Sequence, residues 1–293
     1  MTTRTTVQAF FDEATNTVSY MVSDPITHQG VFIDPVLDYD HSSGKVSTQS
    51  AQGMLEAARS KNIEIIRILE THVHADHLSA APFLKQQTGA PICIGRHIKK
   101  VQEIFASFFN LDDISGQGSE FDQLFADGDT FPVGSLQATV FYTPGHTPAC
   151  ISYLIGDALF VGDTLFMPDY GTARTDFPGG SAKALYTSIR RLLALPPSTR
   201  IFVCHDYKAK GRNHIAWETT IQAQREGNIH AREGISQEEF VQMRTQRDAT
   251  LPAPALLLPS IQVNIRAGRW PAPENNGMQY LKIPLTLQHE CDS

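Results

Sequence analysis

Seven residues with metal-binding side chains follow short apolar runs of this chain. They are five of the eleven histidines and two aspartates: His72, His74, His77, His146, His205, Asp76 and Asp163. Imidazole nitrogens and carboxylates are the usual ligands of zinc and of non-haem iron in proteins. The sequence Thr-His-Val-His-Ala-Asp-His at 71–77, followed by a separate Gly-His and a separate Gly-Asp, indicates a metal centre rather than scattered structural histidines.

The elements that must position these residues are predicted strands. Each run is short, rich in β-branched or aromatic residues and bounded by turn residues, which is typical of a strand. The four runs are 63–69, 136–142, 158–161 and 200–204. Helical patterns lie between them at 50–60, 78–87, 97–109, 181–195 and 214–226, and strand-like alternation occurs at 18–22 and 30–33. The sequence therefore predicts a mixed α/β protein with helix-covered sheets and chemistry at four strand ends.

The composition excludes several classes of function. The 293 residues include 24 Lys and Arg against 31 Asp and Glu, so the net charge is -7. A protein that neutralises nucleic-acid phosphates would carry a basic surplus. The chain has no run of about eighteen apolar residues and no apolar signal segment within residues 1–20, so we expect no membrane association.

The cysteines suggest a reducing compartment. Cys93, Cys150, Cys204 and Cys291 are widely spaced and form no CxxC pair. This spacing argues against a disulfide scaffold and against a thiolate zinc site. We expect a cytoplasmic protein in which Cys150 and Cys204 are buried as small hydrophobic residues.

The C-terminal part differs from the rest of the chain. Residues 236–247 are predicted to form a helix with Ser236 as its N-cap, and the segments 251–254 and 271–273 are extended and proline-rich. We predict a catalytic domain at 1–230 and an extension at 231–293 that packs on the same domain.

The motifs THVHADH, PGHT, GDT and CHD, in this order, resemble the metallo-β-lactamase fold superfamily over about residues 5 to 230. The resemblance implies an αββα sandwich with its metals at one edge of the sheets. In dinuclear hydrolases of this superfamily, such as glyoxalase II, the matching ligands form two sites. These would be His72, His74 and His146 at the first site, Asp76, His77 and His205 at the second, and Asp163 between them.

The flanking sequence is more similar to the persulfide dioxygenases related to the ethylmalonic encephalopathy protein. The similar stretches are 173–177, 182–189, 205–207 and 264–268, which extend the match to about residue 270. This resemblance implies one Fe(II) per chain, held by His72, His146 and Asp163, an environment expected of a non-haem iron oxygenase. The other four metal-binding residues would then support these ligands from behind or form a second metal site that stays empty: His74, Asp76, His77 and His205.

The implied reaction belongs to hydrogen sulfide metabolism. Glutathione persulfide would react with O2 and water to give sulfite and glutathione. Candidate substrate-binding residues are three arginines that suit carboxylates and two residues that match thiol-site positions of the family: Arg174, Arg225, Arg266, Tyr207 and Asn264. Arg225 is equally well interpreted as a surface ion pair. A homodimer is expected from the family.

Two other functions stay open at this point. The complete ligand set favours a dinuclear zinc or mixed-metal thioester hydrolase of the glyoxalase II type. A non-catalytic sensor of metal or persulfide is a third alternative, and it would bind persulfide without repeated oxygen uptake.

Overall fold

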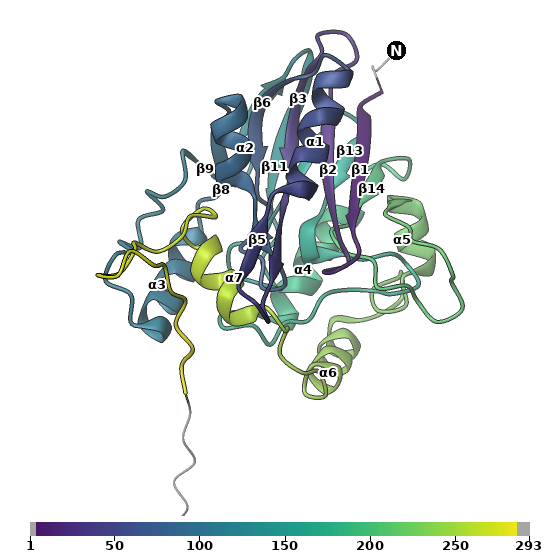
Figure 1. Ribbon diagram of the computed structural model, residues 1–293. Coiled ribbons are helices and arrows are strands. Elements are labelled where there is room, and N and C mark those ends of the chain that lie inside the picture. Colours follow the sequence, from purple (N-terminus) through teal and green to yellow (C-terminus); the bar gives the residue numbers. More distant parts are fainter. Residues whose placement is uncertain (1–3, 286–293) are drawn as a thin grey trace, which may run out of the picture.

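Two mixed β-sheets lie face to face, and helices cover the outer side of each. The computed structural model describes residues 4–285. Figure 1 shows α1 and α2 over the purple and blue strands of the first sheet, with the teal strands of the second sheet behind them. The helices are α1 (Gln49–Ser60), α2 (Ala81–Thr88), α3 (Ile98–Phe109), α4 (Ala182–Leu193), α5 (Ile221–Gly227), α6 (Gln237–Asp248) and α7 (Leu257–Asn264), and a 3-10 turn, η1, spans Gly162–Thr164.

The first sheet has six strands. In spatial order they are β1 (Thr6–Asp12), β2 (Thr17–Ser23), β3 (Gln29–Ile33), β6 (Glu64–Leu69), β8 (Ile92–Gly95) and β9 (Gln123–Phe125). The β1–β2 and β2–β3 pairs are antiparallel, whereas β3, β6, β8 and β9 run parallel. Parallel strands need crossover connections, and α1 and α2 supply two of them.

The second sheet also has six strands, and a small third sheet extends the structure. The second sheet consists of β10 (Thr130–Val133), β11 (Leu136–Tyr142), β12 (Ile151–Ile155), β13 (Ala158–Phe160), β14 (Arg200–Phe202) and β15 (Glu218–Thr220). Only β13 and β14 are parallel in it. The third sheet orders β5 (Lys45–Ser47), β4 (Val36–Asp40) and β7 (Leu78–Ser79).

Three apolar clusters hold the layers together. Val31, Val140 and Tyr153 belong to a buried cluster between the two large sheets. A second cluster lies between the first sheet and helices α1, α2 and α3, and a third joins the second sheet to α4 and α6. The layers therefore follow the order α, β, β, α, which confirms the predicted αββα sandwich.

Most predicted elements occur with shifted ends. The strand predicted at 136–142 matches β11, and the helix predicted at 97–109 begins one residue later. Residues 78–79 form β7 rather than the start of a helix, because they pair with Val36 and Leu37 of β4. Similarly, residues 218–220 pair with β14 as an edge strand, so α5 begins only at Ile221.

The C-terminal part contacts both outer layers. Phe240 of α6 is buried against α4, and its ring centroid lies 5.5 Å from that of Tyr186. Helix α7, which the sequence analysis did not predict, buries Ile261 and Val263 in the cluster beneath α3. The division of the chain at residue 230 stays a prediction, and residues 286–293, including Cys291, lie outside the described residues.

Two further findings concern the cysteines and the length of the helices. Cys150 and Cys204 are free and buried, as expected for small apolar side chains, and Cys93 is free and buried as well. Across residues 4–285, no helix combines the length and the apolar character needed to span a bilayer.

Candidate functional site

The candidate metal ligands gather where strands of both large sheets end. His72 to His77 follow β6 of the first sheet. His146, Asp163 and His205 follow β11, β13 and β14 of the second sheet. The site therefore bridges the two sheets at one edge, on rigid elements that fix the spacing of its side chains.

Two glycines allow the loops to approach closely at this edge. Gly162 has a φ of +51°, and a Cβ at this position would lie 2.6 Å from the Thr71 hydroxyl. Gly145 has a φ of +151°, and its Cβ would lie 2.3 Å from the Cα of Leu185 in α4. A residue with a Cβ would be strained at both positions. Glycine therefore allows the loops that carry Asp163 and His146 to lie close to their neighbours at the site.

His72, His146 and Asp163 form one compact group of possible ligands. Their nearest ligand atoms all lie within 4.8 Å of one another. Asp163 Oδ2 is 3.9 Å from His72 Nε2 and 3.6 Å from His146 Nε2. All three side chains are buried. Two imidazoles and one carboxylate gathered in this way match the donor set of a non-haem iron site.

The outward ring nitrogens of these histidines are held by neighbouring groups. His146 Nδ1 donates to the Arg174 carbonyl at 2.8 Å, and His72 Nδ1 lies 2.9 Å from the Thr71 hydroxyl. That hydroxyl donates to Asp34 at 2.8 Å, so it must accept from His72 Nδ1–H. His72 Nε2 therefore keeps its lone pair and faces the centre, as a metal ligand requires.

Several inward-facing atoms lack partners. Among residues 4–285, the buried Nε2 atoms of His72, His77 and His205 and the Oδ1 atom of Asp163 have no hydrogen-bond partner. Buried polar atoms are normally satisfied, and leaving one unpaired costs about 1 to 3 kcal/mol. A cation held by these lone pairs would satisfy them, so the residues fit a metal centre.

The remaining candidate ligands lie on the other side of Asp163. Asp163 Oδ1 is 3.3 Å from His205 Nε2, which lies 3.5 Å from Asp76 Oδ2. His74, Asp76 and His77 form a further group of nearby ligand atoms. The two oxygens of Asp163 thus face two different groups, which is the arrangement expected of a bridging carboxylate.

Two buried carboxylates lie beside the ring of His74. Its Nε2 atom lies 3.0 Å from Asp34 Oδ1 and 3.6 Å from Glu70 Oε2. Burial lowers the pKa of His74, but the charges of Asp34 and Glu70 outweigh burial and raise this pKa to about 9. Burial and the charge of Asp34 raise the pKa of Glu70 to about 8.

Burial has the opposite effect on two other histidines. Burial, and then the proximity of His74, lower the pKa of His72 well below its usual value and also lower that of His77. Both rings are therefore neutral near pH 7, the form that binds a metal ion. Burial raises the pKa of Asp76, but His205 and His77 outweigh it and hold this pKa well below its usual range.

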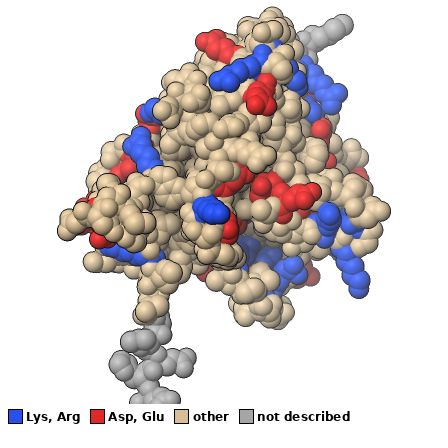
Figure 2. Space-filling model, in the orientation of Figure 1, with Lys and Arg blue, Asp and Glu red and all other residues tan. Residues whose placement is uncertain are grey.

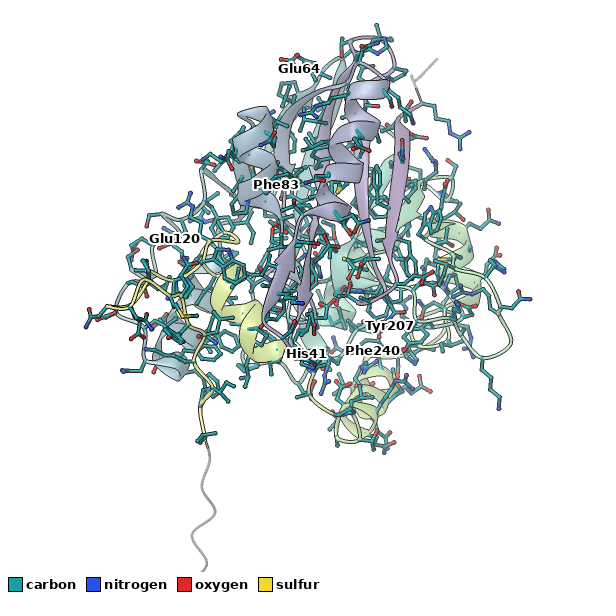
Figure 3. The ribbon with its side chains drawn as sticks, in the orientation of Figure 1. His41, Glu64, Phe83, Glu120, Tyr207 and Phe240 are labelled. Carbon is teal, nitrogen blue, oxygen red and sulfur yellow. The ribbon has the colours of Figure 1, made fainter. Side chains whose placement is uncertain are left out.

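A pocket of about 400 Å³ opens onto the candidate ligands. His146, Asp163 and Asp76 line its floor, and aromatic walls come from Phe166, Tyr170 and Tyr207. The outer wall is the segment 251–256, which we call the proline strap, and helix α6 forms the rim. Figure 3 labels Tyr207 of this pocket. Pockets of this size suit small molecules.

Two candidate substrate-binding residues, Arg174 and Tyr207, line this pocket. The guanidinium of Arg174 is already engaged, however. It donates to both oxygens of Asp176 at 2.6 Å and to the Pro252 carbonyl at 2.6 Å. Arg174 therefore anchors the proline strap and shapes the pocket wall.

Three other predicted substrate residues are placed elsewhere. Arg225 forms an ion pair with Glu233, and Arg266 donates to both oxygens of Asp113 at 2.9 and 2.6 Å. Asn264 is buried behind the metal-binding loop. Pairing with an acidic residue, which sequence spacing does not reveal, engages both arginines. These three residues lie outside the lining of the pocket, and their substrate-binding role stays a prediction.

The sequence analysis also missed two contributors. Asp34 directly follows β3, so it carries the same strand-end signal as the other ligands, but without a neighbouring histidine it was passed over. Arg247 reaches the pocket only because α6 packs against α4, and no local pattern indicates that contact.

Residues 16–205 match the metallo-beta-lactamase superfamily, and the chain belongs to this family. It is 51% identical to a probable metallo-hydrolase of Burkholderia pseudomallei, over 96% of this chain and 99% of that protein. It is 47% identical to glyoxylase B2 of Dictyostelium discoideum, over 97% and 98% of the two chains. The chain spans only 64% of the length of a beta-lactamase hydrolase-like protein of Xylella fastidiosa.

Similarity to persulfide dioxygenases is more distant. The human protein persulfide dioxygenase ETHE1, mitochondrial, is 27% identical over 89% of this chain and 88% of its own. The crystal structure of ETHE1 from Myxococcus xanthus superposes with a TM-score of 0.72 at 31% identity. It covers 90% of this chain and 100% of that chain.

Proposed function

We propose that the protein is a persulfide dioxygenase that converts glutathione persulfide, O2 and water to glutathione and sulfite at one non-haem iron. The compact group of His72, His146 and Asp163 carries this proposal, because it unites two imidazoles and one carboxylate beside a pocket. The likeness to ETHE1 of Myxococcus xanthus supports the same reading.

The reaction balances without another redox partner. The terminal sulfur of the persulfide loses four electrons, O2 accepts them, and water supplies the third oxygen of sulfite. Fe(II) held by the three ligands would supply a Lewis-acidic position for the sulfur and the activation of O2.

The protein's own residues position the reactants. The Arg174 carbonyl and Thr71 fix the rings of His146 and His72, so the open face of the site points into the pocket. The proline strap and the rings of Tyr170 and Tyr207 exclude water from the organic part of the substrate. Orientation in this way is worth several kcal/mol in a two-substrate reaction.

A second candidate function is a thioester hydrolase of the glyoxalase II type with two metals. The observation that favours it is the position of Asp163 between two groups of possible ligands. Names among the relatives, metallo-hydrolase and glyoxylase, favour it as well. A sensor that binds persulfide or metal without turnover is the third candidate.

One experiment separates the three functions. Purified protein loaded with Fe(II) is supplied with glutathione persulfide, and O2 uptake and sulfite are measured. Hydrolysis of S-lactoylglutathione is followed in parallel with Fe(II)- and Zn(II)-loaded protein, and metal content is determined. Repeated O2 uptake with about one iron per chain supports the dioxygenase. Thioester cleavage with two metals supports the hydrolase, and binding without either turnover supports the sensor.

A further inference from the structure

Three arginines line the proposed substrate pocket, and two of them form ion pairs with protein carboxylates. Arg174 is bound to Asp176 and to the proline strap. Arg244 is buried, donates to the Thr172 carbonyl at 3.0 Å and forms an ion pair with Asp248. Among residues 4–285, the side chain of Arg247 forms neither an ion pair nor a hydrogen bond, although it lines the same pocket and is exposed.

Helix α6 holds Arg247 at the rim through contacts on either side of it. Ser236 and Glu239 form a capping box that fixes the start of the helix. Phe240 anchors the helix to α4, and Asp248 accepts hydrogen bonds from Thr175 at 2.8 and 3.1 Å. Arg247 directly precedes this anchored aspartate, so its backbone is fixed while its guanidinium remains available.

The charge around the pocket makes a local cation necessary for an anionic substrate. Asp76 and Asp163 lie on the floor, and the chain as a whole carries a charge of -7. Figure 2 shows acidic and basic side chains scattered over the visible face without an extended basic patch. Long-range attraction therefore does not bring an anion to this pocket, and recognition falls to individual side chains.

We propose that Arg247 is the specificity-determining residue of the pocket and binds a carboxylate of the thiol portion of the substrate. This inference rests on the proposed function for the identity of the thiol. A planar guanidinium binds a carboxylate through two parallel hydrogen bonds, which a lysine does not reproduce. The selected substrate has sulfur at the metal-binding floor and a carboxylate at the α6 rim.

The test compares two persulfides that differ in their carboxylates. Glutathione persulfide carries two, and cysteamine persulfide carries none. Arg247→Ala should raise KM for glutathione persulfide about ten- to hundredfold, the loss expected for a charged hydrogen bond, and leave kcat within about twofold. KM for cysteamine persulfide should not change, and Arg247→Lys should restore only part of the loss. Arg232→Ala, an exposed arginine outside the pocket lining, is the matched control.

A binding measurement keeps the inference independent of catalysis. Calorimetry with S-methylglutathione and metal-free protein should show the same ten- to hundredfold loss of affinity in Arg247→Ala. Unchanged binding, or equal KM changes for both persulfides, would overturn the role of Arg247. If the wild-type protein consumes no O2, the dioxygenase proposal fails, and calorimetry alone decides whether Arg247 binds the carboxylate.

Discussion

The side-chain amide of Asn264 donates to the backbone carbonyls of His74 at 2.9 Å and of His77 at 2.8 Å. Its Oδ1 atom accepts from the backbone N–H of Ser79 at 2.9 Å. One buried residue of α7 thus supports the metal-binding loop from behind. This contact links a helix close to the C-terminus to residues almost two hundred positions earlier.

Replacing Asn264 by Ala should weaken metal binding and stability together. Two carbonyls and one N–H lose their partner, so we expect a loss of about 1 to 3 kcal/mol in the free energy of unfolding and about 10- to 100-fold in metal affinity. Urea denaturation and metal titration measure both. A rise in KM with stability and metal affinity unchanged would instead favour direct substrate binding by Asn264.

Loss of a proposed iron ligand should differ from loss of a residue of the second group. His72→Ala and Asp163→Ala should lose iron affinity by more than the 10- to 100-fold typical of a supporting residue and should abolish O2 uptake. His77→Ala should keep about one iron per chain. Iron analysis after gel filtration checks this, with His41→Ala, labelled in Figure 3 and exposed, as the control. Equal iron loss in His72→Ala and His77→Ala would contradict a mononuclear site.

Adding a single methyl group at Gly145 should destabilise the protein. A Cβ would lie 2.3 to 2.4 Å from backbone atoms of Leu185. A helix backbone, unlike a side chain, cannot relieve such a contact by changing its rotamer. We expect a loss of about 1 to 3 kcal/mol, measured by urea denaturation. Gly53→Ala is the matched control, because Gly53 lies inside α1 with open space around it, and it should gain about 0.5 to 1 kcal/mol. If Gly145→Ala leaves the free energy of unfolding unchanged, the loop can shift to accommodate the methyl group, and the predicted strain is wrong.

His230 should make stability depend on pH. Burial, together with the charges of Arg244 and Arg247, lowers the pKa of His230 from 6.5 to about 4. The ring is neutral in the folded protein, where Nδ1 accepts from the Thr172 N–H at 3.0 Å. The unfolded chain therefore binds a proton first as the pH falls, and stability declines between about pH 6.5 and 4. The decline amounts to about 2 kcal/mol by pH 5.

The measurement compares urea denaturation of metal-free protein at about pH 7.5 and pH 5. His230→Gln keeps an acceptor for Thr172 but cannot be protonated, so about 2 kcal/mol of the pH dependence should disappear. If the wild type and the variant lose stability equally, other groups account for the acid sensitivity.

The sequence predicted the chemistry of the site better than its surroundings. Strand ends such as Tyr142 and the HxHxDH motif carry local signals, so the four strand ends that carry candidate metal ligands could be predicted from the sequence. Local signals failed at residues 78–79 and 218–220, because hydrogen bonding to β4 and β14 decided their conformation. Sheet pairing is a property of the partner strand, which single-segment propensity does not include.

The surroundings of the candidate substrate-binding arginines could not be predicted for a related reason. Arginine suits a carboxylate ligand, but a carboxylate of the protein itself satisfies it equally. Arg266 forms an ion pair with Asp113, and Arg174 forms one with Asp176. Among the described residues, the side chain of Arg247 has no such partner, although it lines the pocket. Which arginine is available depends on three-dimensional packing, since Asp113 lies more than 150 positions before Arg266.

The floor and the outer wall of the pocket come from different parts of the chain. The floor residues lie between 76 and 163, within the stretch that matches the superfamily, whereas α6 and the proline strap lie beyond residue 205. Evolution can therefore preserve the metal-binding residues of the floor while the residues of the outer wall change. Relatives that share the candidate metal ligands are expected to differ in the molecules they accept, and exchanging residues 236–256 between two of them should transfer this substrate preference. Phylogenies built on the shared metal-binding residues would group such enzymes by their metal rather than by their substrate.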